Sequence, residues 1–498
     1  MRLTDALIEQ EYKLKDGGCI DGLIIKGVTC DSRQVKPGYL FAAFQGTNEN
    51  GCTFVSEAIF KGAAAIILEK NLAKTLNCKE VPIITVSNSR KAYAVISSNV
   101  YKPSPKTIVA ITGTNGKTSS ASFLRQIWSG LGVPSCSGGT LGLELAGPNL
   151  NKNKNLISKS NLTTPDSADL HRYLQQLSIH NINNVVLEAS SHGLAQYRLD
   201  GLQISAAAFT NLSRDHLDYH GDFKKYMAAK RRLFTELLVK KGLAVVNNDD
   251  PFSMNLISDL QKDCHKILSY GFRGDEIKIV SVEPEANGQL LVVEVFGARY
   301  EARVPLVGAF QISNIMCALT LAIGLGSDTE EAINQLSKLK GVPGRIERVG
   351  ETSAGATIYV DYAHSPDSLA ALLKALRIYT KKNLYLVFGC GGDRDSGKRK
   401  QMGEIADRYA DRVVITDDNP RFEDPNKIRE EIKFGCPSGE EIGNREEAIR
   451  FAIRNLCKGD TLVIAGKGHE NSQIIGETML KFSDNGVVRK ILKEDVNA

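Results

Sequence analysis

Thr107-Ile-Val-Ala-Ile-Thr112 runs directly into Gly113-Thr-Asn-Gly-Lys-Thr-Ser119, and this stretch decides the fold class. Its first half is a short run of β-branched and apolar residues, which predicts a buried parallel strand. Its second half is a glycine-rich turn followed by a helical pattern, the arrangement of a phosphate-binding loop. The backbone N–H groups of such a turn and the start of the helix favour an anion. We therefore predict a nucleotide site made by Gly113, Thr114, Asn115, Gly116, Lys117, Thr118 and Ser119.

Two residues carry the chemistry that is expected of this loop. Lys117 would reach the β- and γ-phosphates of ATP, and the hydroxyl of Thr118 would hold Mg²⁺. The spacing departs from the general pattern, because Ile111 stands where the first glycine is expected. The loop still lies between a buried strand and a helix, so we interpret it as an ATP site and not as an ordinary turn.

Further strands of the same kind follow along the chain, at Asn184–Glu188 and Ala206–Thr210, and helical patterns alternate with them. This alternation predicts a parallel sheet that is covered by helices on both faces. We assign it to a central P-loop ATPase domain over residues 104–341. The fold class is therefore α/β.

Two further α/β domains are expected to flank the central one. A small N-terminal module covers residues 1–103 and ends at the proline-rich linker Tyr101-Lys-Pro-Ser-Pro105. A Rossmann-like domain covers residues 342–498 and starts near Val342-Pro-Gly344. No strand–GxGxxG–helix pattern is present in it, so we assign no dinucleotide cofactor. Its expected strands are 357–361, 383–388, 412–416 and 461–465, and its expected helices are 367–379, 398–410 and 444–456.

The composition of the chain excludes several classes of function. The net charge of +5 is spread along 498 residues, and no basic run carries interleaved aromatics, so we expect no nucleic-acid partner. The ten cysteines form no C-x-x-C pair, which favours reduced thiols. No apolar stretch reaches the ~18–20 residues of a membrane span, and no signal-peptide pattern opens the chain. We expect a cytoplasmic monomer that acts on small molecules.

Eight ordered motifs resemble those of the Mur ligases of peptidoglycan synthesis. Besides Ile111–Thr118 they are Glu188-Ala-Ser-Ser-His-Gly193, Asn211-Leu-Ser-Arg-Asp-His216, Gly308-Ala-Phe-Gln-Ile-Ser-Asn314, Pro343-Gly-Arg-Ile-Glu347, Asp361-Tyr-Ala-His-Ser-Pro366, Phe388-Gly-Cys-Gly-Gly-Asp-Arg394 and Ala465-Gly-Lys-Gly-His-Glu470. The family has three domains, which agrees with the boundaries above. It activates a carboxylate as an acyl phosphate with ATP and then joins it to an amine.

The resemblance implies roles for individual residues around ATP. Glu188, His216 and Thr118 become Mg²⁺ ligands, and Lys230 is carbamylated by CO₂ so that it ligates a second Mg²⁺. Taken alone, Lys230 in Tyr226-Met-Ala-Ala-Lys230 would be a solvated charge, so this role depends on the family. Asn314 would contact the adenine, and Arg345 the phosphates. His364 and Asp361 are given a supporting place in the cleft.

The resemblance also implies the residues that bind the two other substrates. The UDP-N-acetylmuramoyl-dipeptide would meet Cys30, Ser32, Thr47, Asn48, Leu162, Thr163, Thr164, Ser190, Gln196 and Arg198. Leu162 stands where the family can carry Asn. The motif Asp418-Asn-Pro-Arg421 resembles the members that add meso-diaminopimelate to a D-glutamate residue. That amino acid would meet Arg394, Asp418, Asn419, Pro420, Arg421, Gly466 and Glu470.

Several alternative functions remain open. The same reaction with L-lysine is disfavoured by Arg421, which would be left unpaired beside a cation. A folylpolyglutamate-type ligase is disfavoured by the UDP-type N-terminal module. A non-catalytic nucleotide-binding regulator would have lost Lys117, Glu188, His216 or Lys230, and all four are present. Asn471-Ser472 and Asp484-Asn485 depart from the family's usual Asp-Tyr and Asp-Arg, and we place both at the rim of the amino-acid pocket.

Overall fold

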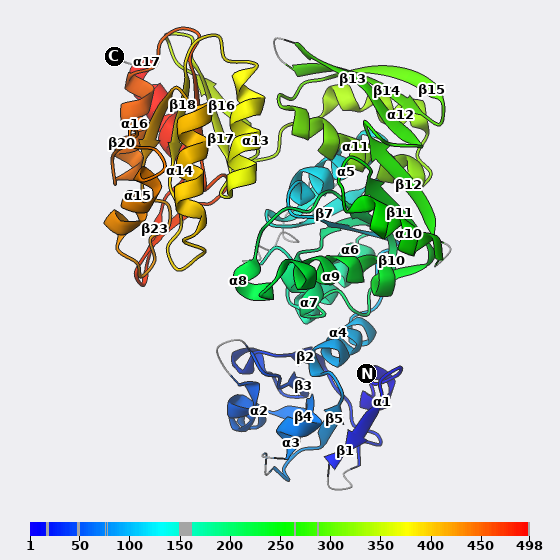
Figure 1. Ribbon diagram of the computed structural model, residues 1–498. Coiled ribbons are helices and arrows are strands. Elements are labelled where there is room, and N and C mark those ends of the chain that lie inside the picture. The colour runs from blue at the N-terminus through cyan, green and yellow to red at the C-terminus, as the bar shows by residue number, and fades with distance from the viewer. Residues whose placement is uncertain are drawn as a thin grey trace.

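The computed structural model describes residues 1–15, 19–46, 50–74, 76, 78–148, 162–262, 265–285 and 288–496. Among these residues, three large β-sheets follow one another along the chain, each with its own helices, and a two-stranded sheet comes after the third (Figure 1). The structure therefore has the mixed α/β class predicted from the sequence, while the domain boundaries at 103/104 and 341/342 stay predictions. Among the described residues, no helix is both long enough and apolar enough to cross a membrane.

The N-terminal sheet has five strands in the order β1-β5-β4-β3-β2, of which only β1 is antiparallel to its neighbour. Its strands are β1 (Tyr12–Leu14), β2 (Gly27–Thr29), β3 (Tyr39–Ala42), β4 (Ala63–Glu69) and β5 (Ile83–Val86). Its helices are α1 (Leu3–Ala6), α2 (Val55–Phe60), α3 (Lys70–Ala73) and α4 (Ser89–Val100).

The central sheet has ten strands, and its parallel part is formed by β7-β9-β6-β10-β11-β12-β13. These strands are β6 (Thr107–Thr112), β7 (Ser135–Gly139), β9 (Asn184–Glu188), β10 (Ile204–Phe209), β11 (Leu238–Asn247), β12 (Lys266–Gly271) and β13 (Ile277–Glu285). Antiparallel strands extend both edges, namely β8 (Gly142–Ala146), β14 (Gly288–Val295) and β15 (Ala298–Val304). The sheet is thus parallel at its centre, as predicted, and mixed at its edges.

Both faces of the central sheet are buried, because alternate residues of β6 enter different cores. Val109 and Ile111 pack in one apolar cluster and Ile108 and Ala110 in the other. The covering helices are α5 (Lys117–Gly130), α6 (Ser167–Ile179), α7 (Ser191–Ala195), α8 (Leu217–His220), α9 (Phe223–Arg232), α10 (Ser253–Lys262), α11 (Ala309–Gly324) and α12 (Thr329–Asn334). A strand that is apolar on both faces explains the uninterrupted apolar run seen in the sequence.

The C-terminal sheet has the order β16-β17-β21-β18-β19-β20, with only β16 antiparallel. Its strands are β16 (Glu347–Glu351), β17 (Thr357–Asp361), β18 (Leu384–Phe388), β19 (Arg412–Ile415), β20 (Glu440–Glu441) and β21 (Thr461–Ala465), followed by the hairpin β22 (Ser472–Ile475) and β23 (Thr478–Lys481). Its helices are α13 (Pro366–Arg377), α14 (Lys398–Tyr409), α15 (Pro425–Lys433), α16 (Arg445–Arg454) and α17 (Asp484–Val496).

Candidate active site

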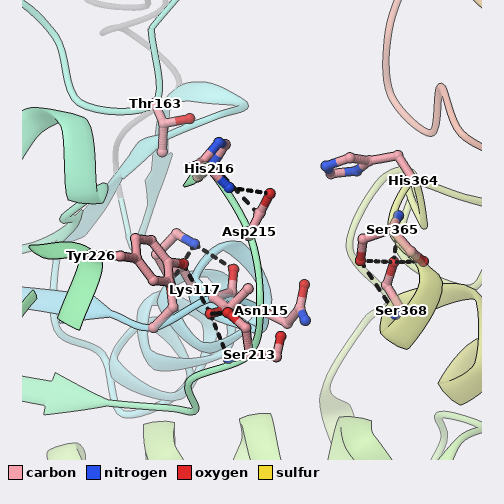
Figure 2. Close-up of polar contacts among 12 residues, drawn as sticks. Asn115, Lys117, Thr163, Ser213, Asp215, His216, Tyr226, His364, Ser365 and Ser368 are labelled. Carbon is pink, nitrogen blue, oxygen red and sulfur yellow. Dashed lines mark hydrogen bonds and ion pairs between the residues drawn. The ribbon is translucent and has the colours of Figure 1, made fainter. Parts of the chain in front are cut away.

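A cleft of about 500 Å³ lies between the central and C-terminal domains. The residues predicted to bind ATP or metal that line it are Thr114, Asn115, Gly116, Lys117, Thr118, Ser119, Glu188, His216, Lys230, Asn314 and Arg345. Its opposite wall comes from the turn after β17 and the start of α13. Figure 2 shows this arrangement, with His364, Ser365 and Ser368 across from Lys117 and His216. The structure therefore brings together residues that are more than 200 positions apart.

The phosphate loop has the backbone that its glycines predict. Gly113 and Gly116 have φ values of +148° and +87°, which other residues rarely adopt. A Cβ on Gly113 would overlap Thr210 Oγ1, and one on Gly116 would overlap Asn314 Oδ1. The loop closes on itself, because Lys117 Nζ donates to the carbonyls of Gly113 at 2.9 Å and Thr114 at 2.8 Å. Asn314, predicted near the adenine, thus lies beside the phosphate loop.

Glu188 ends β9 and its carboxylate is held from both sides. Oε2 accepts from Thr118 Oγ1 at 2.8 Å and Thr140 Oγ1 at 3.1 Å, and Oε1 accepts from the Thr140 backbone N at 2.8 Å. The side chain is buried, and a Cβ on Gly139 would overlap it. Glu188 and Thr118, both predicted metal ligands, are therefore in direct contact.

Lys230 of α9 is buried behind the phosphate loop, with 3% of its surface exposed. Its Nζ donates to the Gly113 carbonyl at 2.6 Å and lies 4.5 Å from the centre of the Tyr226 ring. Tyr226 in turn shares a 2.9 Å hydrogen bond with Thr114 Oγ1. Burial, and then the neighbouring Lys117, lower the pKa of Lys230 well below its ordinary value. The amine is thus driven toward its neutral, nucleophilic form.

His216 stands at the N-terminus of α8 in the left-handed conformation, with φ of +52°. Its Nε2 lies 3.5 Å from Asp215 Oδ2, and its ring packs edge-on against His192 at 4.8 Å between centres. Burial in the cleft lowers the pKa of His216 although Asp215 opposes the shift, which leaves the imidazole neutral and able to ligate a metal. Within the described ranges, no group of three or more His, Cys, Asp or Glu side chains is placed to hold a metal ion.

The predicted acceptor-substrate residues form a connected strip beside Glu188. Thr163 and Ser190 line the cleft, and Thr163 Oγ1 lies 3.1 Å from Thr140 Oγ1. Thr164 Oγ1 donates to the Glu188 carbonyl at 2.8 Å and contacts Ser190 Oγ at 3.0 Å. The strip continues through Arg198, whose guanidinium donates to the Thr164 carbonyl at 2.7 Å and to Gln196 Oε1 at 2.6 Å. Leu162 is exposed and does not line the cleft.

The predicted UDP residues lie farther away, in the N-terminal domain. Ser32 Oγ donates to Glu57 Oε2 at 2.6 Å. Cys30 Sγ donates to Asp166 Oδ2 at 3.4 Å, across the junction with the central domain. Burial, and then Asp166, raise the pKa of Cys30 well above its ordinary value, so the thiol stays protonated. Thr47 and Asn48 lie outside the described residues.

The predicted amino-acid residues form a second cluster at the carboxyl edge of the C-terminal sheet, where open α/β sheets bind ligands. Arg394 follows β18, Asp418, Asn419, Pro420 and Arg421 follow β19, and Gly466 and Glu470 follow β21. None of these seven described residues lines the 500 Å³ cleft. Asn419 Nδ2 donates to Glu470 Oε2 at 3.0 Å, and Arg421 Nη1 donates to the Gly392 carbonyl at 2.7 Å.

A stack of side chains joins this second cluster to the cleft. The guanidinium of Arg345 lies 4.4 Å from the centre of the Tyr362 ring, and that ring packs against His469 at 5.3 Å. Asp361 accepts from the Ile346 and Ala363 backbone N atoms at 2.7 Å each, which fixes the end of the linker Val342–Arg345 between the central and C-terminal domains. His469 directly precedes Glu470, so the linker touches the loop that carries Glu470.

Several residues of the site were missed from the sequence. Asp215 lies in the cleft, where His216 and His364 keep its pKa below the ordinary value against the effect of burial. Thr140 holds Glu188, and Tyr362 stacks on Arg345. Lys467 is fully buried in the second cluster. Asp215, Tyr362 and Lys467 stand inside the quoted motifs, which was the available signal, whereas nothing in the sequence singled out Thr140.

One of the four predicted rim residues lies in the interior. Asp484 is fully buried and accepts two hydrogen bonds from Arg445, at 2.7 and 2.8 Å, so it anchors α17 in the interior. Asn485 Nδ2 donates to Glu347 Oε2 at 2.8 Å, at the strand that follows the linker. Ser472 begins the hairpin β22–β23. The prediction that Asp484 belongs to the rim is therefore wrong.

Comparison with known proteins covers all three domains. Residues 24–101 match the Mur ligase family catalytic domain, 111–322 the Mur ligase middle domain, and 344–468 the Mur ligase glutamate ligase domain. A Rhizobium meliloti (strain 1021) protein named UDP-N-acetylmuramoyl-L-alanyl-D-glutamate–2,6-diaminopimelate ligase is 45% identical, over 94% of each chain. A Bradyrhizobium diazoefficiens protein of that name is 46% identical, over 96% of each chain.

A solved structure gives the same assignment. The solved structure of a protein of that name superimposes with a TM-score of 0.66 at 34% identity, over 95% of this chain and 96% of the other. Similarity thus extends over nearly the full length in both sequence and fold. The chain belongs to the Mur ligase family of ATP-dependent, ADP-forming amide ligases.

Proposed function

We propose that this chain joins meso-diaminopimelate to the D-glutamate of UDP-N-acetylmuramoyl-L-alanyl-D-glutamate in peptidoglycan precursor synthesis. Relatives about 45% identical over nearly the whole chain carry the name of this activity. The observation that carries the choice of amino acid is the cluster of Arg394, Asn419, Arg421 and Glu470 at one sheet edge. Guanidinium groups fit the distal carboxylate of the amino acid, and the Glu470 carboxylate fits its distal ammonium.

The first step needs ATP and the D-glutamate γ-carboxylate, two anions, at one place. Lys117 would neutralise the β- and γ-phosphates, and Arg345 would contact them from the other wall of the cleft. The γ-carboxylate attacks the γ-phosphorus, the bond to ADP breaks, and an acyl phosphate forms. The strip of Thr163, Ser190 and Arg198 would hold the acceptor beside Glu188. Positioning and electrostatics therefore dominate the work of the protein.

The residues present fit Mg²⁺. Glu188 and Thr118 offer the oxygen ligands that this ion prefers, and both are buried and face the cleft. His216 offers a neutral imidazole. When bound, Mg²⁺ would offset the repulsion between phosphate and carboxylate. Lys230 fits only after its neutral amine adds to CO₂ and loses a proton, because the resulting carbamate is an anion and an ammonium would repel the metal.

The second step is an attack on the acyl phosphate. The α-amine of diaminopimelate adds to the carbonyl carbon, and the tetrahedral intermediate expels phosphate. We propose that rotation about the linker Val342–Arg345 brings the amino-acid cluster over the phosphate loop. Closure would also exclude water, which hydrolyses acyl phosphates.

The test is phosphate release by the purified chain with ATP, Mg²⁺, bicarbonate and the UDP-muramoyl-dipeptide. Meso-diaminopimelate should support turnover, and L-lysine should give a kcat/KM lower by ~10⁴-fold, because it leaves Arg421 unpaired. Equal turnover with lysine would replace the proposal by the lysine-adding alternative. No phosphate release with either amino acid would refute the ligase proposal and favour a nucleotide-binding regulator.

The Lys117→Ala variant is the internal control of this assay. Loss of one preorganised cation should lower kcat roughly 10³-fold, while the circular dichroism spectrum stays unchanged. Replacing the UDP substrate by a folate and glutamate tests the folylpolyglutamate alternative, and we expect no turnover. We further propose that the chain works in the cytoplasm as a monomer.

A further inference from the structure

Lys467 has a place that the proposed reaction does not yet explain. It follows β21 and is fully buried, yet it carries an ammonium group. Its Nζ lies 3.0 Å from Asn419 Oδ1, 3.0 Å from Glu470 Oε2 and 4.0 Å from Asp418 Oδ1. A buried charge is costly unless it is paired, and here every partner belongs to the predicted amino-acid cluster.

Lys467 fixes the orientation of Asn419. The Oδ1 atom of Asn419 accepts from Lys467 Nζ and from the Ile474 backbone N, both at 3.0 Å. Two donors on one side require the oxygen to face them, so the amide nitrogen must point the other way. That nitrogen donates to Glu470 Oε2 at 3.0 Å.

Lys467 fixes Glu470 as well. Oε2 accepts from both Lys467 Nζ and Asn419 Nδ2, which immobilises the carboxylate. Within the described part of the chain, no residue donates to Oε1, and about a third of the side chain is exposed. One carboxylate oxygen is therefore occupied, and the other is left for a ligand cation.

The charges around the cluster agree with this arrangement. A Cβ on Gly391 would lie 2.9 Å from Arg421 Nη1 and 3.8 Å from Arg394 Cγ, so both arginines lie against the same glycine. Asp418 and Glu470 form the acidic side of the cluster. Lys467 stands between these two carboxylates, and without it they would repel each other, so Glu470 would lose its fixed position.

We infer that Lys467 is a positioning residue that aims Glu470 and Asn419 at the distal ammonium of the incoming amino acid. This inference rests on the proposed function. In this proposal Lys467 itself does not touch the substrate, since it is fully buried, donates to Asn419 and Glu470 and forms a 4.0 Å ion pair with Asp418. Its effect should appear only with substrates that carry a distal ammonium.

The experiment pairs Lys467→Met with two amino acids. With meso-diaminopimelate, loss of an aimed, charged hydrogen bond should lower kcat/KM about 10- to 100-fold, mainly through KM. With 2-aminopimelate, which keeps the distal carboxylate and lacks the ammonium, the change should stay within about threefold. The KM for ATP should not move. Equal losses with both amino acids would mean that Lys467 is only a structural element of the core, and the inference would fall.

A second variant covers the case in which Lys467→Met does not fold. Glu470→Gln with Lys467→Met removes one charge of each sign, and its kcat/KM for diaminopimelate should lie within about threefold of Glu470→Gln alone. A further tenfold loss would overturn the inference. Lys374→Met removes an exposed lysine near Tyr409 in the same domain and should leave all constants unchanged.

The two levels of failure can be told apart. Wild-type protein without diaminopimelate-dependent phosphate release would contradict the proposed function. Active wild-type protein whose Lys467→Met variant uses diaminopimelate as well as the wild type does would contradict only the role of Lys467.

Discussion

The burial of Lys230 lowers the stability of the fold and at the same time keeps its amine reactive. Its Nζ is buried against Gly113, and burial, followed by the neighbouring Lys117, lowers its pKa. A buried cation beside another cation destabilises the fold, and the same pressure keeps the amine neutral and able to react with CO₂. Stability and readiness for carbamylation therefore oppose each other at this position.

We predict that Lys230→Met is inactive but more stable than the wild type in CO₂-free buffer, by about 1–3 kcal/mol near pH 7. The lowered pKa means that the unfolded chain binds the extra proton between the folded and unfolded pKa values, so wild-type stability rises with pH in that window. The difference in the free energy of unfolding between the variant and the wild type should therefore shrink as the pH rises toward 10.

Urea unfolding of both proteins at several pH values, with and without bicarbonate, measures this difference. Bicarbonate should stabilise only the wild type. A variant that is less stable than the wild type at every pH would show that the buried ammonium is not a burden on the fold.

For single residues, the sequence predicts which side chains belong to the site better than it predicts how deeply they are buried. Lys117, Glu188 and Thr118 follow from the strand–loop–helix pattern and the family motifs, and they meet in one cleft. The burial of Lys230 and Lys467 could not be predicted, because an isolated lysine in a sequence is usually a solvated charge. Only the packing of α9 and of the loop after β21 places these two charges inside.

Elements with apolar runs on both faces are the predictable part of the fold. Strands β6, β9, β17 and β21 begin and end at the predicted residues. The antiparallel hairpin β14–β15 was not predicted: β14 carries a short apolar run, 290–293, but alternates buried with half-buried positions, and β15 is mostly exposed and charged. A search of the sequence for buried parallel strands therefore does not find the antiparallel strands toward the edge of the sheet.

The segment between the central and C-terminal domains is tied to the amino-acid cluster by two glycines. Gly344 has φ of +67°, and a Cβ there would overlap the backbone of Gly468 and His469. Gly468 has φ of +53°, and a Cβ there would lie 2.8 Å from Tyr362 Cβ. The linker that carries Arg345 and the loop that carries Glu470 therefore move together.

Gly344→Ala should push these two segments apart. We expect the KM values for ATP and for diaminopimelate to rise together by about tenfold or more, with a stability loss of about 1–3 kcal/mol from backbone strain. Gly355→Ala is the matched control, because Gly355 also has a positive φ, of +84°, while a Cβ there would meet side chains at ordinary contact distance, Lys458 Cγ at 3.7 Å and Glu351 Oε1 at 3.9 Å.

Steady-state kinetics and thermal unfolding of the two variants distinguish a loss of stability caused by backbone strain from a loss of the contact between the linker and the Glu470 loop. Both should melt earlier than the wild type, and only Gly344→Ala should lose affinity. A rise in a single KM for Gly344→Ala would rule out the proposed mechanical link.

At the scale of the whole molecule, Asp166 joins the N-terminal domain to the central one. Its Oδ1 accepts from Tyr93 Oη at 2.6 Å and from the Ala168 backbone N at 3.0 Å, so the same carboxylate caps α6. Its Oδ2 accepts from Cys30. Ser98 adds a bond to the Gly201 carbonyl at 2.8 Å. The N-terminal domain thus contacts the central domain close to the predicted acceptor strip.

Tyr93→Phe removes the hydroxyl and leaves the Asp166 carboxylate one donor short. We expect a stability loss of about 1.5–3 kcal/mol and a several-fold rise in the KM for the UDP substrate, with the KM for ATP unchanged. Tyr385→Phe removes a neutral 3.2 Å bond to Asn455 in the C-terminal domain and should leave both KM values unchanged. Unaltered UDP-substrate kinetics in Tyr93→Phe would show that this junction does not orient the N-terminal domain.

The fixed position of the Glu188 carboxylate affects how the site can bind a cation. Its carboxylate cannot swing away, because donors from α5 and from the turn after β7 hold both oxygens. An arriving cation therefore meets a carboxylate whose rotational freedom was already lost during folding. A divalent cation would therefore cost little further conformational entropy when it binds Glu188, whether the two domains lie apart or together.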